Sequence, residues 1–299
     1  MLAMNMRWPV AVGGYLALYI ALDWVSLIHP TGAPGALGIT PWNPPAGLSF
    51  ALLLRFGPIF IPAVFAAVTL ANLLFHGLSD APFTILASAL TIALVYGAAA
   101  MMLRNRFLIS IRLRTHRDLL MLLAVSMAAT MLVAVSVVAS FTVSGLLARD
   151  EFWGFALHFW VGDMIGIAGF TPLVLLMIDA QRRAATIQEL RPREHALQLC
   201  AVAFGLWIIF GWEPTDHFEY SYVLFLPLIW IALRGGLIGA TWGILATQLG
   251  LMLAIQIKGF DADVTTQFQL LMLAVAVTGL VLGSIVEEEE RAESSLRKL

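Results

Sequence analysis

Residues 119–147 read LLMLLAVSMAATMLVAVSVVASFTVSGLL and contain no charged side chain. A helix that spans a bilayer needs about 20 mostly apolar residues, because the hydrocarbon core offers no water to satisfy polar groups. At 29 residues this stretch is long enough. It therefore predicts a transmembrane helix, and the rest of the chain can be measured against it.

Nine further stretches have the same apolar character. They lie near residues 8–28, 42–56, 58–75, 82–103, 153–178, 196–211, 220–233, 237–257 and 266–286. The sequence thus predicts an all-α polytopic transmembrane bundle of about ten spans, or eight if short neighbours merge or re-enter. The stretch 42–56 extends only roughly 21 Å at about 1.5 Å per residue, less than the roughly 30 Å hydrocarbon core. We expect a short or broken second span there.

The composition excludes several classes of protein. Of 299 residues, 60% are hydrophobic and 12% are charged, whereas about 25% are charged in a typical soluble domain. This balance argues against a soluble enzyme, a disordered segment and a nucleic-acid-binding protein. Cys200 is the only cysteine, so an intramolecular disulfide and a cysteine-bound zinc or iron–sulfur cluster are not possible.

The basic residues indicate the orientation, because cytoplasmic loops of membrane proteins carry an excess of Lys and Arg. With ten spans and a cytoplasmic N-terminus, two of the 17 basic residues, Arg149 and Lys258, fall outside and the other 15 fall inside. Both termini are therefore predicted to be cytoplasmic. The first apolar stretch is long and contains Asp23, so we expect it to remain as a span rather than to be cleaved as a signal peptide.

The last span runs into a charged segment, residues 287–299, with no Gly or Pro to stop the helix. Four apolar residues at the end of the span and in this segment follow a heptad spacing that Glu289 interrupts; they are Ile285, Ala292, Leu296 and Leu299. One interpretation is a solvated terminal helix. The other is that residues 1–286 form a membrane domain and residues 287–299 start a cytoplasmic linker, pairing as a homodimer and leading to an output domain outside this chain.

Three blocks of sequence resemble a known family. The first, residues 42–57, reads WNPPAGLSFALLLRFG and is followed by Pro62 and by Ala71, Asn72 and Leu73. The second is FWVGD at residues 159–163 with Gly166 and Pro172, and the third is PLIW at 227–230 with Arg234, Gly235, Gly236 and Gly239. In these blocks the chain, from about Trp8 to Arg291, resembles the MASE1 family of bacterial integral membrane sensor domains.

The resemblance implies a function. MASE1 domains lie at the N-terminus of histidine kinases, diguanylate cyclases and related proteins of two-component and cyclic di-GMP signalling. This chain would accordingly be a sensor in the bacterial inner membrane that relays a stimulus to a C-terminal output domain. The stimulus would be a small ligand, a lipid or a membrane partner protein. The chain itself is not expected to be an enzyme, since neither a GGDEF signature nor a phosphoacceptor-histidine block is present.

The alternative function is a small-molecule transporter or a ligand-binding membrane protein. Ten spans, a broken second helix and polar groups within the membrane also suit a substrate pathway. However, the double-proline block has no inverted repeat in the second half of the chain. Uptake by proteoliposomes would separate a transporter from a sensor.

Asp163 is the sharpest candidate for a ligand-binding or signalling residue. It lies ten residues after Trp153, so at about 1.5 Å per residue it is roughly 15 Å into the membrane. A carboxylate at that depth is costly and usually faces the bundle interior with a partner. We expect it to be protonated or to be hydrogen-bonded to groups such as Asn72, Gln248 or a tryptophan N–H, with Trp160 one turn away. A purely structural hydrogen bond is the competing interpretation.

Other polar groups are predicted at a common depth in the outer leaflet. They are Asp23 and Asn72 within spans, and Asn43, Pro44 and Pro45 at the start of the short second span. Two prolines either break a helix that lines a cavity or mark an ordinary helix start. The sequence leaves both alternatives open.

No cofactor or metal is predicted. Four histidines map to the outer side, but none has the spacing of a haem or metal ligand pair; they are His29, His76, His158 and His217. Tryptophans such as Trp42 and Trp153 are expected in an aromatic belt at the membrane surface. A stripe of glycines, Gly235, Gly236, Gly239 and Gly243, is expected to serve helix packing rather than phosphate binding.

Overall fold

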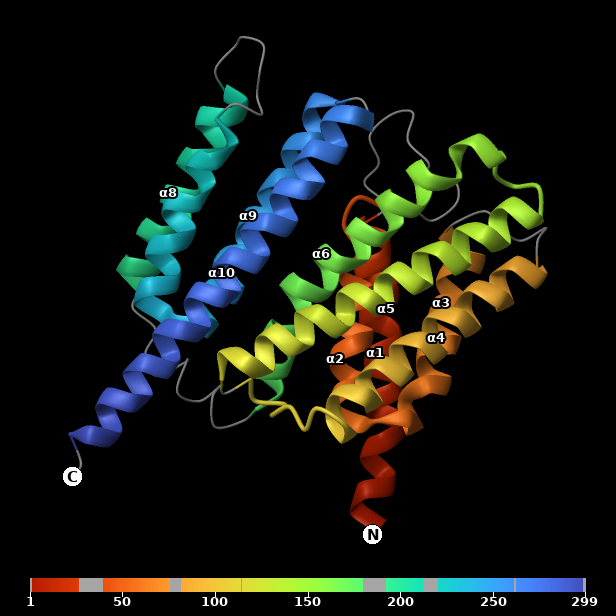
Figure 1. Cartoon of the computed structure of the whole chain (residues 1–299), viewed down its shortest axis with the longest axis horizontal. Coiled ribbons are helices and arrows are strands. Elements are labelled where there is room, and N and C mark those ends of the chain that lie inside the picture. The colour runs from red at the N-terminus through yellow and green to blue at the C-terminus, as the bar shows by residue number, and fades with distance from the viewer. Residues whose placement is uncertain are drawn as a thin grey trace.

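The computed structural model describes residues 2–26, 40–75, 82–113, 115–179, 192–211, 220–260 and 262–297, and it is all-α over these ranges. Figure 1 shows the helices side by side in one bundle. They are α1 (Leu2–Ser26), α2 (Pro44–Phe56), α3 (Ile61–Phe75), α4 (Pro82–Asn105), α5 (His116–Val143), α6 (Phe152–Ile178), α8 (Pro192–Gly211), α9 (Phe225–Lys258) and α10 (Ala262–Leu296). The predicted fold class is confirmed.

In the described part of the chain, eight helical segments are long and apolar enough to cross a membrane. The helix α2 has only 13 residues and is not one of them. This is the stretch whose length predicted a short second span. Its C-terminal end is a sharp turn at Gly57, whose φ of 78° is in the left-handed region that favours glycine.

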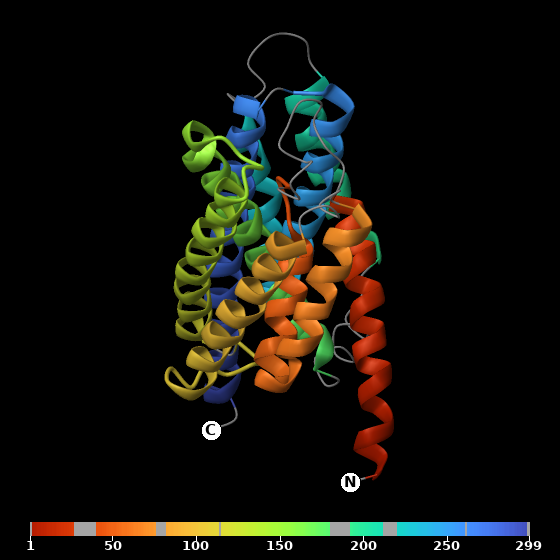
Figure 2. The same ribbon diagram turned by 90° about the vertical axis from the view of Figure 1, so that its right-hand side faces the viewer.

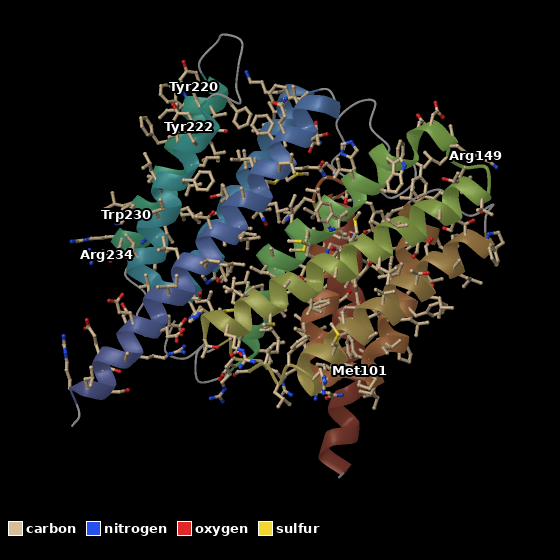
Figure 3. The ribbon with its side chains drawn as sticks, viewed as in Figure 1. Met101, Arg149, Tyr220, Tyr222, Trp230 and Arg234 are labelled. Carbon is tan, nitrogen blue, oxygen red and sulfur yellow. The ribbon has the colours of Figure 1, made fainter. Side chains whose placement is uncertain are left out.

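The helix α9 contains a reversal of the chain. Gly236 in its middle has φ 55° and ψ −147°, which is not helical. Ile231 on one side of this glycine packs against Gly239 and Gly243 on the other side, as two antiparallel arms require. Figure 3 shows the first arm, which runs from Tyr220 near the top of the molecule past Trp230 down to Arg234. The two arms correspond to the separate spans predicted at 220–233 and 237–257.

If the two arms of α9 are counted separately and α2 is added, the eight candidate spans become ten passes through the bundle, of which α2 and the first arm of α9 are shorter than a full span. An even number of passes brings both termini to one side of the membrane. Figures 1 and 2 show both ends of the chain at the same end of the bundle. Arg149, one of the two basic residues predicted outside, lies at the opposite end (Figure 3).

The helix α6 forms the centre of the bundle. In its 18-residue apolar stretch, 78% of the residues are buried, against 22% in α1 and 28% in α8. It contacts α2, α5, α9 and α10, and its apolar residues point in all directions, as expected for a helix surrounded by others. Any group on α6 is therefore positioned by several neighbours at once.

Small residues allow neighbouring helices to pack closely against each other. Gly283 and Gly279 of α10 lie against Gly236, Ala240 and Leu228 of α9, which agrees with the packing role predicted for the glycine-rich stretch. Gly235 is the exception, because a Cβ added there would meet no neighbouring atom. The helices α9 and α10 consequently form a tightly packed pair.

Candidate functional site

The segment before α2, residues 40–43, is held at every position, and we call it the strap. Thr40 Oγ1 donates a hydrogen bond to the Trp42 carbonyl oxygen at 3.0 Å. The Pro41 carbonyl accepts from Gln269 Nε2 at 3.0 Å, and Trp42 Nε1 donates to Gln248 Oε1 at 3.1 Å. These partners lie on α10 and α9, so the strap joins the N-terminal helices to the C-terminal pair.

The last strap residue, Asn43, meets Asp163 of α6. Asn43 Nδ2 donates to Asp163 Oδ1 at 2.6 Å, and the Tyr96 hydroxyl of α4 donates to Asp163 Oδ2. Asp163 is 2% exposed and Tyr96 is fully buried. Both donors are neutral. Among the described residues, the Asp163 carboxyl group is therefore held by hydrogen bonds and not by a basic side chain. We call Asn43, Tyr96 and Asp163 the carboxylate cluster.

The double proline explains how α2 can begin within the bundle. The first N–H groups of a helix have no partner within the helix, and no water satisfies them in a membrane. Pro44 and Pro45 occupy the first two positions and have no N–H. The Asn43 N–H donates to the Gly162 carbonyl and the Ala46 N–H donates to the Asn43 carbonyl, each at 3.2 Å. The N–H groups of Asn43 and Ala46 are therefore paired, and the Asn43 side chain caps no N–H of α2.

Three glycines allow the strap and α2 to touch the backbone of α6. A Cβ on Gly162 would overlap the Thr40 carbonyl oxygen, and a Cβ on Gly166 would overlap the Asn43 carbonyl oxygen. A Cβ on Gly47 would overlap the Gly166 carbonyl oxygen. The carboxylate cluster thus depends on backbone contact between two segments, which only glycine permits at these points.

Gln269 extends the network to the outer end of α6. Its Oε1 lies 3.0 Å from His158 Nδ1, and Thr266 Oγ1 lies 3.5 Å from His158 Nε2. Gln248 is 1% exposed, and its Nε2 has no hydrogen-bond partner in the described part of the chain. A Cβ on Gly169 would lie 2.5 Å from Gln248 Oε1. Gln248 of α9 and Gln269 of α10 therefore each contact both the strap and α6.

The sequence model of the MASE1 family matches residues 9–290. The chain belongs to the MASE1 family. It is a multi-pass membrane protein of a membrane-associated sensor domain family. Neither a curated protein nor a solved structure matches the chain.

Two of the three MASE1 blocks identified in the sequence meet in this site. The double-proline block supplies Asn43 and the start of α2, and the second block supplies Gly162, Asp163 and Gly166. The third block forms the reversal of α9 at Gly236. The first and second blocks are separated by more than one hundred residues in the sequence, yet they pack directly against each other in the structure.

The predicted partners of Asp163 in this MASE1 domain need correction. Asn72 donates instead to the Val68 carbonyl of its own helix at 2.9 Å, and Trp160 Nε1 donates to the Met127 carbonyl of α5 at 3.2 Å. Gln248 bonds to Trp42. Depth in the membrane was predicted from spacing along each helix, but the direction of a side chain depends on how that helix is rotated against its neighbours.

Asp23 lies at the edge of the cluster. It is 7% exposed, and Ser26 Oγ donates to its main-chain oxygen at 2.8 Å. The buried Tyr19 lies near enough to both Asp23 and Asp163 to interact electrostatically with them. Tyr15 adds a further contact, 2.8 Å from Ser49 Oγ, which itself donates to the Pro45 carbonyl.

Tyr96, Trp42 and Gln269 were missed as members of the site. Tyr96 lies in an otherwise apolar helix, where one hydroxyl hardly changes the hydropathy. Trp42 was expected in the aromatic belt but is 3% exposed and bonded to Gln248, whereas Trp153 is 70% exposed as a belt residue would be. Polar atoms in apolar spans are the signal that could have found all three.

Prolines 44 and 45 begin a helix, which was one of the two alternatives left open. Of the outer histidines, His158 bonds to Gln269; His29, His76 and His217 lie outside the described residues. Within the described ranges, no group of three or more His, Cys, Asp or Glu side chains could hold a metal ion. The prediction that no cofactor binds is not tested by this arrangement.

The C-terminal end of α10 carries the stripe of apolar residues at heptad spacing that is predicted to pair two chains. The helix continues without a break to Leu296, as the lack of Gly and Pro predicted. Ile285 is 48% exposed and Leu296 is 71% exposed, and Ala292 is also exposed. Leu299 lies outside the described residues. The stripe is thus accessible from solvent or from a second chain.

Proposed function

We propose that this MASE1 domain is the input module of a signalling protein of the bacterial inner membrane. It relays a stimulus to a C-terminal cytoplasmic output domain, a histidine kinase or a diguanylate cyclase. The observation that carries this proposal is the continuity of α10. One helix holds Gln269, which bonds to the strap beside the carboxylate cluster, and also the charged segment that leaves the bundle.

The geometry supports transmission along α10. Gln269 and Glu288 are nineteen residues apart on one unbroken helix, or about 28 Å at about 1.5 Å per residue. A shift of the strap changes the hydrogen bond to Gln269 and therefore the position of α10. The close packing of Gly279 and Gly283 on α9 makes the α9–α10 pair move together.

The carboxylate cluster is the proposed point of entry for the stimulus. Asp163 accepts hydrogen bonds from two neutral donors on two other segments, so any ligand, lipid or partner that competes for either donor changes how α2, α4 and α6 fit together. Two arrangements of the bundle would then be populated differently with and without the stimulus.

The test is Asp163→Asn in the domain fused to a kinase or cyclase. The amide keeps the size of the carboxyl and part of its hydrogen-bonding capacity, so insertion and folding stay intact, whereas signalling changes. Asn72→Ser is the matched control, because among the described residues the Asn72 side chain donates to the Val68 carbonyl of its own helix and does not contact Asp163. Wild-type expression together with wild-type signalling in Asp163→Asn would contradict the proposal. Ligand uptake by proteoliposomes without any change in output would favour a transporter.

The proposed module acts as a homodimer, paired along Ile285, Ala292, Leu296 and Leu299. The exposure of the first three residues supports this, and apolar residues at heptad spacing pack into a parallel helix pair. Ala292→Cys and Leu299→Cys, each in the Cys200→Ser background, should cross-link between chains under native conditions. Failure of both positions to cross-link would count against a parallel dimer.

A further inference from the structure

A contact between His116 and Glu288 joins the first residue of α5 to the segment of α10 that leaves the bundle, residues 286–296, which we call the exit segment. The backbone N–H of His116 donates to Glu288 Oε2 at 3.0 Å, and His116 Nδ1 lies 2.8 Å from the same oxygen. These two residues are 172 positions apart in the sequence. Glu288 Oε2 of α10 thus contacts both the backbone nitrogen and the ring nitrogen Nδ1 of His116, and so links α10 to α5, which lies far away in the sequence.

The contact completes the N-terminus of α5. The first N–H groups of a helix lack partners within it, and the aligned peptide dipoles favour a negative charge there. Thr115 Oγ1 accepts from the Asp118 N–H at 3.2 Å. Glu288 accepts from the N–H of His116, the first residue of α5. The carboxylate is thus a cap supplied by another helix.

The exit segment is held from a second direction by α9. Glu287 Cβ lies against Gly236 of α9, 3.4 Å from where a Cβ on that glycine would be, and the Glu287 carboxylate pairs with Arg291 of its own helix. Successive residues of a helix point about 100° apart, so Glu287 and Glu288 face different neighbours. His116 of α5 and Ile285, Glu288, Glu289 and Ala292 of α10 line a groove beside this contact.

We propose that His116 and Glu288 are positioning residues that fix the rotation of the exit segment about its own axis. A helix held by α9 on one side and by α5 on another presents the stripe of Ile285 and Ala292 in one direction only. When the contact between His116 and Glu288 opens, the exit segment is supported by α9 alone and can twist relative to α5. We call the contact between His116 and Glu288 the latch. Its role in signalling rests on the proposed function, but its effect on the exit segment does not.

The experiment measures one distance in the full chain. Spin labels are attached to Arg117→Cys on α5 and Ser295→Cys on α10, both exposed, in the Cys200→Ser background. Double electron–electron resonance in lipid nanodiscs then gives the distance distribution. Glu288→Ala should broaden and shift it. Glu289→Ala, which alters the neighbouring exposed glutamate in the same groove, should leave it unchanged.

Two further variants sharpen the test. Glu288→Gln retains an acceptor for the His116 N–H and should preserve most of the original distribution. His116→Ala removes the ring but keeps the backbone N–H, so its shift should be smaller than that of Glu288→Ala. Identical distributions for Glu288→Ala and the parent would overturn the latch, as would an equal shift from Glu289→Ala.

The result stays separate from the test of the proposed function. A shifted distribution in Glu288→Ala with an unchanged response of the fused output domain would leave the latch standing and contradict its role in relay. An unchanged distribution would remove the latch, whatever the response of Asp163→Asn.

Discussion

The two ends of α10 are held in opposite ways. Near its start, Gln269 is 1% exposed and bonds to the strap and to His158. Near its other end, exposed residues His116 and Glu288 make one contact. Polar contacts without water are costly to break because the separated groups find no other partner, whereas exposed contacts exchange with water at little cost. The buried end therefore defines the structure, and the exposed end can change without unfolding it.

The largest expected effect is at the backbone contact of the buried end. Gly166→Ala would place a Cβ onto the Asn43 carbonyl oxygen, and neither backbone can move aside easily. We expect the free energy of unfolding to fall by about 3 kcal/mol, the upper range for overpacking. Reversible denaturation in detergent micelles measures it.

Gly154→Ala is the matched control for this prediction. It lies on the same helix, and a Cβ there meets nothing within 4 Å. Its free energy of unfolding should stay the same or rise by up to about 1 kcal/mol, because alanine favours helix over glycine. Equal losses in the two variants would mean that α6 does not touch the strap.

Tyr96→Phe should have the next largest effect. It removes one donor to the buried Asp163 carboxyl, and we expect a loss of about 1–2 kcal/mol in the free energy of unfolding. Tyr15→Phe is the control, since Ser49 keeps its bond to the Pro45 carbonyl, and it should cost less. The same denaturation experiment measures both, and the reverse order would contradict the assignment of Asp163 as the centre of the cluster.

The strap itself can be tested by a double-mutant cycle. Gln269→Leu leaves the Pro41 carbonyl without its donor and should cost about 1 kcal/mol. Combined with Asn43→Ala, the loss should be non-additive, because both residues hold the same four-residue segment. Gln269→Leu combined with Thr130→Val, which affects a hydroxyl bonded within α5, should be additive. Additivity in both pairs would show that the strap does not connect α10 to the carboxylate cluster.

The smallest effect on stability is expected at the exposed end. Glu288→Ala should not measurably change the midpoint of unfolding, although it shifts the spin-label distance. A clear fall in the midpoint would show that the contact between α5 and α10 supports the bundle and would remove the contrast between the two ends.

Much of the fold could be predicted from the sequence. Apolar length predicted the spans, the short α2 and the separation of the two arms around Gly236, because hydrophobic length and the need to satisfy backbone groups are local properties. Asp163 was predicted as a site for the same reason, since a carboxylate within an apolar span requires compensation wherever the helix lies.

The partners of Asp163 could not be predicted in this way. Asn72 was placed at a suitable depth, but its amide bonds to its own helix. Which residues face each other depends on the rotation of each helix and on close backbone contacts such as those at Gly47 and Gly166. These are properties of pairs of helices, and a single sequence shows only which positions are small.

The reversal at Gly236 also has a consequence for how the protein enters the membrane. The first arm of α9, from Phe225 to Gly235, has eleven residues and extends about 16 Å at about 1.5 Å per residue. Such a segment is too short to hold its place alone in a hydrocarbon core of about 30 Å. We therefore expect the two arms to insert together as a helical hairpin, so that a substitution at Gly236 impairs insertion before the folded bundle exists.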